Sequence, residues 1–225
     1  IQDHARELGA PLALLGVDFA FDDEGEDWTW WSGEQVLAHL PYPALPGAHQ
    51  LRNAAGVLMA VHALAPRLPV DAAQIAAALS GLELPGRFQR VARRLEYIMD
   101  VAHNPQAAEI FAATLAAEPP AQRSFALIGM LNTKNHAGFL EPLLPHVRHW
   151  HFVSLGGATG APAEALEACL ARLAPRAESV CHASVADAHA AILAAAEPGD
   201  RVLVLGSFLT VGAMLARLSA PGAVA

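Results

Sequence analysis

Polar side chains follow an apolar run in the stretch "YIMDVAHNPQAAEIF", residues 97–111. Asp100 closes the apolar run, and His103 follows three positions later. A carboxylate at the end of a buried strand must find water, a donor or a ligand, because an uncompensated buried charge is costly. Asp100 is therefore a candidate to hold a ribose hydroxyl or to orient a positive group. His103 is a candidate for the same site, although a histidine in a loop can also be merely solvated.

Asn104 and Pro105 have a structural interpretation that holds whatever else they do. Asn is a preferred N-cap residue, and Pro is preferred at the first position of a helix. An apolar pattern of helical period follows them. The pair therefore predicts the start of a helix.

Two further segments carry polar residues directly after apolar runs. "GMLNTKN" (129–135) contains Lys134, the only lysine among the 14 basic residues. Its ammonium is either simply exposed or meets a carboxylate or phosphate as a compact point charge. "GSFLT" (206–210) places Ser207 either in a tight turn alone or at an anion site made by helix N–H groups. It is not the GxSxG elbow of hydrolases, which needs a second glycine two residues after the serine.

Strand and helix patterns alternate regularly from residue 87 onward. The strand patterns lie at 87–93, 95–102, 124–131, 149–155, 177–183 and 200–207. The helical patterns lie at 104–118, 135–147, 161–174, 184–198 and 209–219. This alternation predicts an α/β fold with a mostly parallel sheet and helices on both faces, in which ligands bind beyond the carboxyl ends of the strands. We therefore expect one site shared by Asp100, His103, Asn104, Lys134 and Ser207.

The first 84 residues have a mixed pattern. Strands are expected at 11–21 and 27–33, a hairpin tip at the acidic residues 22–27, a Pro-rich loop at 40–47, and helices at 50–65 and 71–82. Asp71 is a plausible N-cap of the last helix, which Gly81 would end. "ELPGRF" (83–88) is the best domain boundary, because Pro85 and Gly86 interrupt the helical pattern before a strand pattern begins.

Composition excludes several classes of protein. The net charge is −8 and the basic residues are scattered, which argues against a nucleic-acid partner. Apolar runs are too short to span a membrane, and residues 1–11 lack the basic and apolar blocks of a signal peptide. Two cysteines without a CxxC pair favour a reduced, cytoplasmic protein. No zinc pattern, GxGxxG or Walker loop is present, so no metal ligands and no dinucleotide or triphosphate loop are predicted within the chain.

Because the chain begins at Ile1, within a helical pattern, we expect it to be a piece of a longer protein.

Five segments, in this order, resemble those of the folylpolyglutamate synthase and dihydrofolate synthase family, which belongs to the Mur ligase superfamily. They are "LPGAHQLRNAAGVLMAVHAL", "LPGRFQRV", "DVAHNPQAA", "IGMLNTKN" and "VLVLGSFLTV". The chain departs from many relatives at Thr133 and Asn135, which replace the two acids of "DKD", and at Leu209, which replaces the histidine of "GSFHT".

The resemblance implies that the chain is the C-terminal half of such an enzyme. Residues 1–84 would end a P-loop-type central ATPase domain, and residues 85–225 would form a Rossmann-like C-terminal glutamate ligase domain. The P-loop, the magnesium ligands and most of the pterin pocket would precede Ile1. "ELPGRF" would be a hinge between the two domains.

The resemblance also implies roles for individual residues. The adenine side of ATP would meet Asn53, with His49 and Gln50 lining the same pocket. Arg87 would reach the ATP phosphates and Asp100 would lie at the nucleotide, so both are expected in the ATP site.

The remaining roles concern the reaction and the second substrate. His103 would act near the reacting centre or the incoming glutamate, so Asp100 and His103 are the expected catalytic residues. Lys134 and Ser207, with His103, would hold the amino-acid substrate.

The implied reaction is acyl-phosphate ligation with ATP and Mg²⁺. ATP would phosphorylate a carboxylate of dihydropteroate or of a folate, and the amine of L-glutamate would displace phosphate. We expect a monomer that acts on these small molecules and binds neither nucleic acid nor membrane. Two alternatives remain open. One is another Mur-type amino-acid ligase acting on a peptidoglycan precursor, which "DVAHNP" disfavours. The other is a non-catalytic Rossmann-like binding module.

Overall fold

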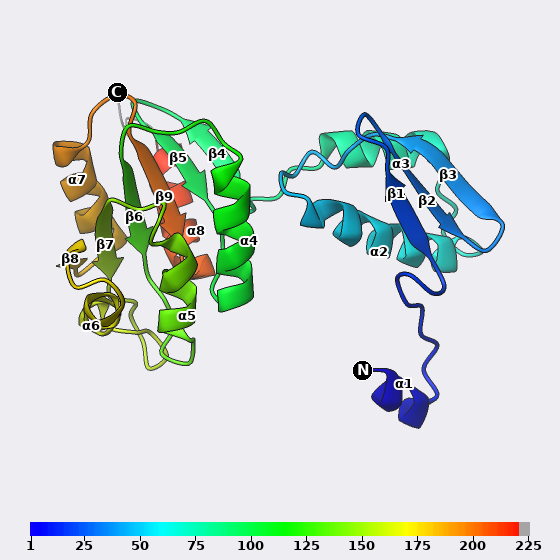
Figure 1. The fold of residues 1–225 in the computed structure, drawn as a ribbon, viewed down its shortest axis with the longest axis horizontal. Coiled ribbons are helices and arrows are strands. Elements are labelled where there is room, and N and C mark those ends of the chain that lie inside the picture. Colours follow the sequence, from blue (N-terminus) through cyan, green and yellow to red (C-terminus); the bar gives the residue numbers. More distant parts are fainter. Residues whose placement is uncertain (221–225) are drawn as a thin grey trace. The chain divides into compact units, whose positions relative to one another are not determined.

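The computed structural model describes residues 1–220, and the chain divides into two compact units. The first comprises Ile1–Glu83 and the second begins at Leu84 (Figure 1). One cluster of buried side chains forms the core of the first unit, and two form the core of the second.

The first unit contains a small antiparallel sheet and three helices, the first of which has no buried residue. Its elements are α1 (Gln2–Leu8), β1 (Ala20–Asp23), β2 (Trp28–Ser32), β3 (Gln35–Leu40), α2 (His49–Leu64) and α3 (Ala72–Gly81), with strand order β1-β2-β3. Alternation along β2 turns Trp28 and Trp30 into the core, where both are fully buried. The indole N–H of Trp30 donates to the carbonyl oxygen of Ala55 at 3.2 Å, which ties β2 to α2.

Most of the predictions for this unit are confirmed. The structure has the strand at 27–33, the hairpin at 22–27, the loop at 40–47 and both helices. Asp71 caps α3 as predicted, accepting the N–H of Gln74 at 2.8 Å, while the Gln74 side chain accepts the N–H of Asp71. Gly81 is the last residue of that helix.

One prediction for this unit was wrong, and one strand was not predicted at all. The strand expected at 11–21 begins only at Ala20, because the chain before it turns at Gly16, whose φ is 84°. The Asp18 carboxylate holds that turn by accepting the N–H of Leu14 at 2.7 Å. Strand β3 was not predicted, because most of its side chains are exposed and its sequence lacks a strong apolar alternation.

The second unit contains one six-stranded sheet. Its strands are β4 (Gln89–Ala92), β5 (Glu96–Met99), β6 (Ser124–Ile128), β7 (His149–Val153), β8 (Glu178–His182) and β9 (Arg201–Leu205), in the order β4-β5-β9-β6-β7-β8. Only the β4–β5 pair is antiparallel, so the predicted mostly parallel sheet is confirmed. Every residue of β9 is buried, as expected for a strand with helices on both sides.

Helices cover both faces of this sheet, as predicted (Figure 1). They are α4 (Pro105–Ala116), α5 (His136–Leu140), α6 (Ala163–Leu173), α7 (Val185–Ala195) and α8 (Phe208–Ser219). Helices α4, α5 and α6 lie in connections between strands that run toward β8, and these helices pack on one core cluster. Helices α7 and α8 pack on the other cluster. Right-handed crossovers explain this division, since the connection from β8 to β9 reverses direction and so places α7 on the opposite face. The helix expected at 135–147 is shortened to α5 and a 3₁₀ turn (Glu141–Leu143), because Pro142 and Pro145 interrupt it.

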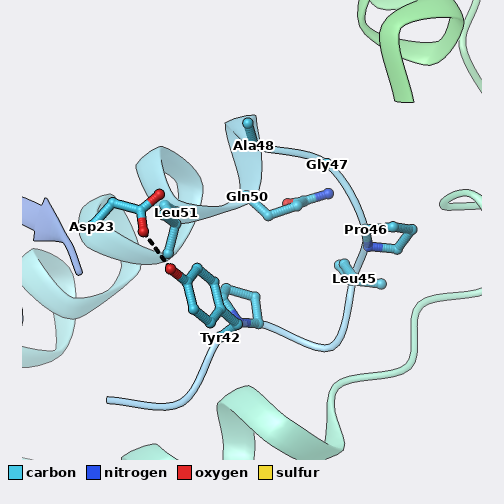
Figure 2. Close-up of a pocket in the computed structure, with 9 residues that line it drawn as sticks. Asp23, Tyr42, Leu45, Pro46, Gly47, Ala48, Gln50 and Leu51 are labelled. Atoms are coloured by element: carbon cyan, nitrogen blue, oxygen red, sulfur yellow. Dashed lines mark hydrogen bonds between the residues drawn. The ribbon is translucent and has the colours of Figure 1, made fainter. Parts of the chain in front are cut away.

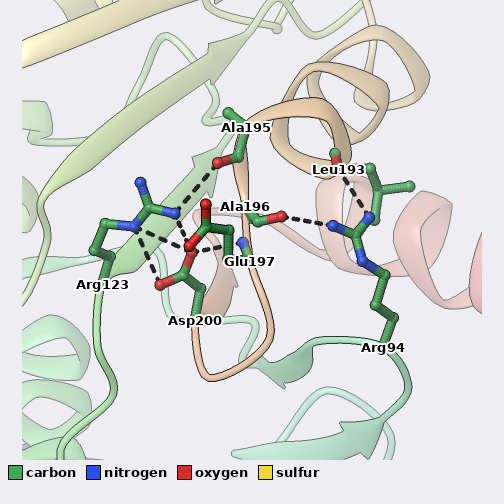
Figure 3. A network of polar contacts seen from close by, with 7 residues as sticks. All are labelled: Arg94, Arg123, Leu193, Ala195, Ala196, Glu197 and Asp200. Atoms are coloured by element: carbon green, nitrogen blue, oxygen red, sulfur yellow. Dashed lines mark hydrogen bonds and ion pairs between the residues drawn. The ribbon is translucent and has the colours of Figure 1, made fainter.

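Ion pairs and hydrogen bonds fix the loop between α7 and β9, near the amino-terminal edge of the sheet (Figure 3). The Arg123 guanidinium donates to the buried Asp200 carboxylate at 2.6 Å, and this hydrogen bond holds the pKa of Asp200 below its usual value. Arg94 donates to the carbonyl oxygens of Leu193 and Ala196 at 3.1 and 2.7 Å. The side chains of Arg94, Arg123 and Asp200 thus serve to hold this loop in place. Within residues 1–220, no helix is long and apolar enough to cross a membrane.

Candidate functional site

The carboxyl ends of β5, β9 and β6 meet at one edge of the sheet. The N–H of Gly206 donates to the carbonyl oxygen of Ala102 at 2.9 Å, which joins the segments after β9 and β5. The Thr210 hydroxyl donates to the carbonyl oxygen of Gly129 at 2.9 Å, which joins α8 to the end of β6. The structure therefore places the three segments singled out in the sequence at one edge.

Asp100 ties the end of β5 to the segment that precedes β4. Its Oδ2 accepts the N–H of Phe88 at 2.8 Å, and its Oδ1 accepts the N–H of Ala102 at 2.7 Å. The half-buried carboxylate is stabilised by these donors, as an ionised acceptor in a partly dry site requires. Sequence reasoning missed this role, which depends on the antiparallel return of β4 beside β5.

His103 follows Asp100 by three positions in the chain and is half-buried. Its Nδ1 is 2.9 Å from the carbonyl oxygen of Val101, which can only accept a hydrogen bond. We therefore assign the proton to Nδ1, and in the neutral ring Nε2 is the nitrogen without one. Asn104 caps α4 by accepting the N–H of Ala107 at 2.9 Å, and Pro105 occupies the first helical position, as predicted.

Ser207 is buried and caps α8. Its Oγ accepts the N–H of Thr210 at 3.0 Å and lies 2.8 Å from the Thr210 hydroxyl. The serine hydroxyl is therefore engaged within the turn from β9 to α8. These contacts agree with the interpretation of "GSFLT" as a tight turn between strand and helix.

Arg87 is exposed and lies over the ring of Phe208, the first residue of α8. The guanidinium carbon is 5.8 Å from the ring centroid, within the range of a cation–π contact. The imidazole of His103 is also near this ring, with centroids 6.4 Å apart. Phe208 thus contacts two of the predicted site residues, although the sequence interpretation passed over it. The available signal was an apolar pair, "FL", at the first turn of a helix on the binding edge.

Lys134 lies at the same edge but apart from this group. Its backbone N–H donates to the carbonyl oxygen of Leu131 at 3.2 Å. In the same loop, the N–H of Asn132 donates to the carbonyl oxygen of Thr159 at 2.9 Å. Within the part of the chain that the structure describes, no hydrogen bond or ion pair engages its ammonium. The structure therefore does not join Lys134 to Asp100 or His103 by a direct contact.

The predicted adenine residues lie at the start of α2 in the first unit. The amide of Asn53 donates to Oε1 of Gln50 at 3.0 Å, and His49 is the first residue of the helix. Gln50 lines a cavity of about 270 Å³ that the Pro-rich loop and the start of α2 enclose (Figure 2). The hydroxyl of Tyr42 donates to Asp23 at its wall, and this hydrogen bond raises the pKa of Tyr42.

No metal centre is found in residues 1–220. There, no group of three or more His, Cys, Asp or Glu side chains is placed so that it could hold a metal ion. The described residues therefore contain polar and cationic groups that can contact a nucleotide or another anion. They do not contain a set of ligands for a divalent cation.

The domain that contains this mostly parallel sheet matches a known family of ligase domains. The family model described as "Mur ligase, glutamate ligase domain" matches residues 86–208, and the chain belongs to this family. Among curated proteins, the dihydrofolate synthase/folylpolyglutamate synthase of Escherichia coli is 38% identical over 94% of this chain and 47% of its own length. That of Haemophilus influenzae is 33% identical over 93% of this chain and 51% of its own length.

Solved structures agree with these relatives. Escherichia coli FolC in complex with DHPP and ADP has a TM-score of 0.82 and 38% identity, over 97% of this chain and 50% of that one. A bifunctional folylpolyglutamate synthase/dihydrofolate synthase was solved with Mn, AMPPNP and L-glutamate bound. Its structure has a TM-score of 0.81 and 36% identity, over 97% of this chain and 50% of that one. The chain spans about half the length of the curated relatives that it matches.

Proposed function

We propose that the protein containing this chain is an ATP-dependent ligase that adds L-glutamate to dihydropteroate, to folates or to both. The likeness to the Escherichia coli dihydrofolate synthase/folylpolyglutamate synthase, 38% identical over nearly the whole chain, carries this proposal. Residues 1–84 are then the end of the central ATPase domain, and residues 85–225 are the glutamate ligase domain. The protein acts as a monomer in the cytoplasm, and its partners are small molecules.

In the proposed reaction, ATP phosphorylates a carboxylate of the pterin substrate, and the glutamate amine then displaces phosphate from the acyl phosphate. Arg87 neutralises charge on the transferring phosphoryl group, for which its planar fork of donors is suited. Asp100 orients the nucleotide, while Nε2 of His103 can take the proton that the attacking amine loses. Lys134 and Ser207 are assigned to the glutamate side, with Ser207 acting through the turn that it caps.

The nucleotide and metal requirements follow from the same likeness. A relative that is 36% identical was solved with Mn, AMPPNP and L-glutamate. We propose that Asn53, Gln50 and His49 face the adenine of ATP, and that Mg²⁺ is the metal used. Because the described residues supply no metal centre, we assign no step of the reaction to a metal bound by them.

The test of this proposal is glutamate-dependent phosphate release by the full-length protein. We expect release with ATP, Mg²⁺, glutamate and dihydropteroate, and separately with a reduced folate in place of dihydropteroate. A chelator should abolish it, and added Mg²⁺ should restore it. Release only with a nucleotide-linked muramyl substrate would instead identify a peptidoglycan-precursor ligase. No release with any of these acceptors would contradict the ligase proposal and favour a binding module.

Replacing Arg87 by alanine should lower kcat/KM for ATP at least about tenfold, or about 1.4 kcal/mol of transition-state stabilisation. The reason is that the exposed guanidinium is available to the phosphates, whereas Lys134, the one lysine of the sequence, lies apart from it at the same edge. Steady-state phosphate release measures the effect. Arg172→Ala, which removes an exposed arginine in the last turn of α6, is the matched control and should retain wild-type kinetics. An Arg87→Ala enzyme within twofold of wild type would remove Arg87 from the ATP site.

A further inference from the structure

Phe208 is a large apolar side chain that the core does not use. It is 63% exposed, although it is the first residue of the well-packed helix α8. Burying a phenylalanine is favourable, so an exposed ring gains nothing from the hydrophobic effect at this position. The ring instead meets Arg87 and His103, both at the proposed reaction site. The ring on which the Arg87 guanidinium rests is therefore suited to hold that side chain in place.

The backbone around Phe208, which directly follows β9, is held by contacts to the ends of two other strands. Gly206 is hydrogen-bonded to Ala102 after β5, and the Ser207 cap holds the first turn of α8. The hydroxyl of Thr210 anchors the same turn to Gly129 after β6. A residue between these anchors has little backbone freedom. The ring is thus a fixed surface against which a mobile side chain can be ordered.

A guanidinium that stacks on a ring keeps its hydrogen-bonding capacity. The contact uses the face of the cation, whereas its five N–H donors lie in its plane and point outward. Arg87 can therefore rest on Phe208 and still present a fork of donors to a phosphate. Ordering a free arginine upon binding costs side-chain entropy, so an arginine ordered in advance binds with less loss.

We propose that Phe208 is a positioning residue that holds Arg87 ready for the ATP phosphates. This inference rests on the proposed ligase function, since it assigns Phe208 to the same site. The ring itself touches no reacting atom, and its effect passes through Arg87. Its removal should therefore matter only when Arg87 is present.

The kinetic test compares Phe208→Leu with Phe208→Tyr in the full-length protein. Loss of an exposed cation–π contact predicts that Phe208→Leu lowers kcat/KM for ATP about two- to fivefold, while Phe208→Tyr retains it. KM for glutamate should change less than KM for ATP. In an Arg87→Ala background, Phe208→Leu should have no further effect. An unchanged Phe208→Leu enzyme, a failure of tyrosine to preserve activity, or an undiminished effect without Arg87 would each overturn the inference.

A second measurement does not depend on catalysis. Nitrogen-15 relaxation of the arginine Nε–H groups, with the Arg87 signal assigned from its loss in Arg87→Lys, reports how ordered the guanidinium is. We expect a lower order parameter for Arg87 in Phe208→Leu and an unchanged one in Phe208→Tyr. Equal values in wild type and Phe208→Leu would overturn the inference even if the ligase activity is confirmed. If wild type releases no phosphate, the proposed function fails, and the relaxation data still decide whether Phe208 orders Arg87.

Discussion

Replacing Gly206 by alanine is expected to destabilise the second unit by about 3 kcal/mol or more. The residue has a φ of 102°, where an L side chain is strained. A Cβ there would lie 2.6 Å from the carbonyl oxygen of Gly129 and 2.9 Å from Met130, so the backbone itself would have to move. The strain falls on the turn that places Ser207 and Phe208. Activity should therefore fall together with stability.

Gly212→Ala is the matched control, since it makes the same chemical change within α8. Gly212 lies in the middle of the helix and is exposed to solvent, and nothing is within 4 Å of an added Cβ. Because alanine favours a helix over glycine, this variant should be stabilised by about 0.4–1 kcal/mol. Native-state hydrogen exchange of β6 and β9 in the full-length protein measures both changes. If Gly206→Ala were as stable as Gly212→Ala, the turn would not be constrained as described.

Acidification is expected to destabilise the second unit through two buried histidines. Burial, with the nearby His182 and His149 as smaller causes, lowers the pKa of His151 to about 4. Burial, with Arg217 as a smaller cause, lowers the pKa of His189 to about 4. Unfolded histidines titrate near 6.5, so between these values the unfolded chain binds more protons than the native one. The contribution of the two neutral histidines to the free energy of unfolding is therefore fully present above about pH 6.5, and it is lost as the pH falls toward 4.

The expected loss is about 2 kcal/mol for each histidine between pH 7.5 and 5. The neutral rings are held by specific contacts, with His151 2.9 Å from His182 and His189 2.8 Å from the Tyr97 hydroxyl. His189→Gln should remove about half of the pH dependence, whereas His4→Gln, on the exposed helix α1, should leave it unchanged. Hydrogen exchange of β6 and β7, corrected for intrinsic rates, measures the slope. A slope that His189→Gln does not alter would show that other groups govern the acid response.

Much of the fold could be predicted from the sequence because its strands and helices carry strong, distinct apolar periods. The continuous apolar run of β9 and the cap of α4 at Asn104 are examples in which local chemistry alone decides the structure. Strand β3 was missed because pairing with β2, rather than an apolar pattern of its own, makes it a strand. Local signals cannot report such tertiary pairing.

The candidate site was predictable only in outline. The rule that ligands meet the carboxyl ends of parallel strands led to the segments at Asp100 and Ser207. It could not show that Asp100 accepts backbone donors from Phe88 and Ala102, or that the Ser207 hydroxyl is occupied within its own turn. It also could not find Phe208, because contacts between side chains from separate segments depend on tertiary geometry.

The place of β9 in the sheet has a consequence for biosynthesis. This strand, the last one in the described part of the unit, pairs with β5 on one side and β6 on the other. A ribosome therefore releases β5 and β6 before the strand that joins them has been made. Until then, each presents an open edge that can pair with another nascent chain. We expect chaperones to engage this unit during translation, and premature termination before residue 201 to yield an aggregating product rather than a smaller folded domain.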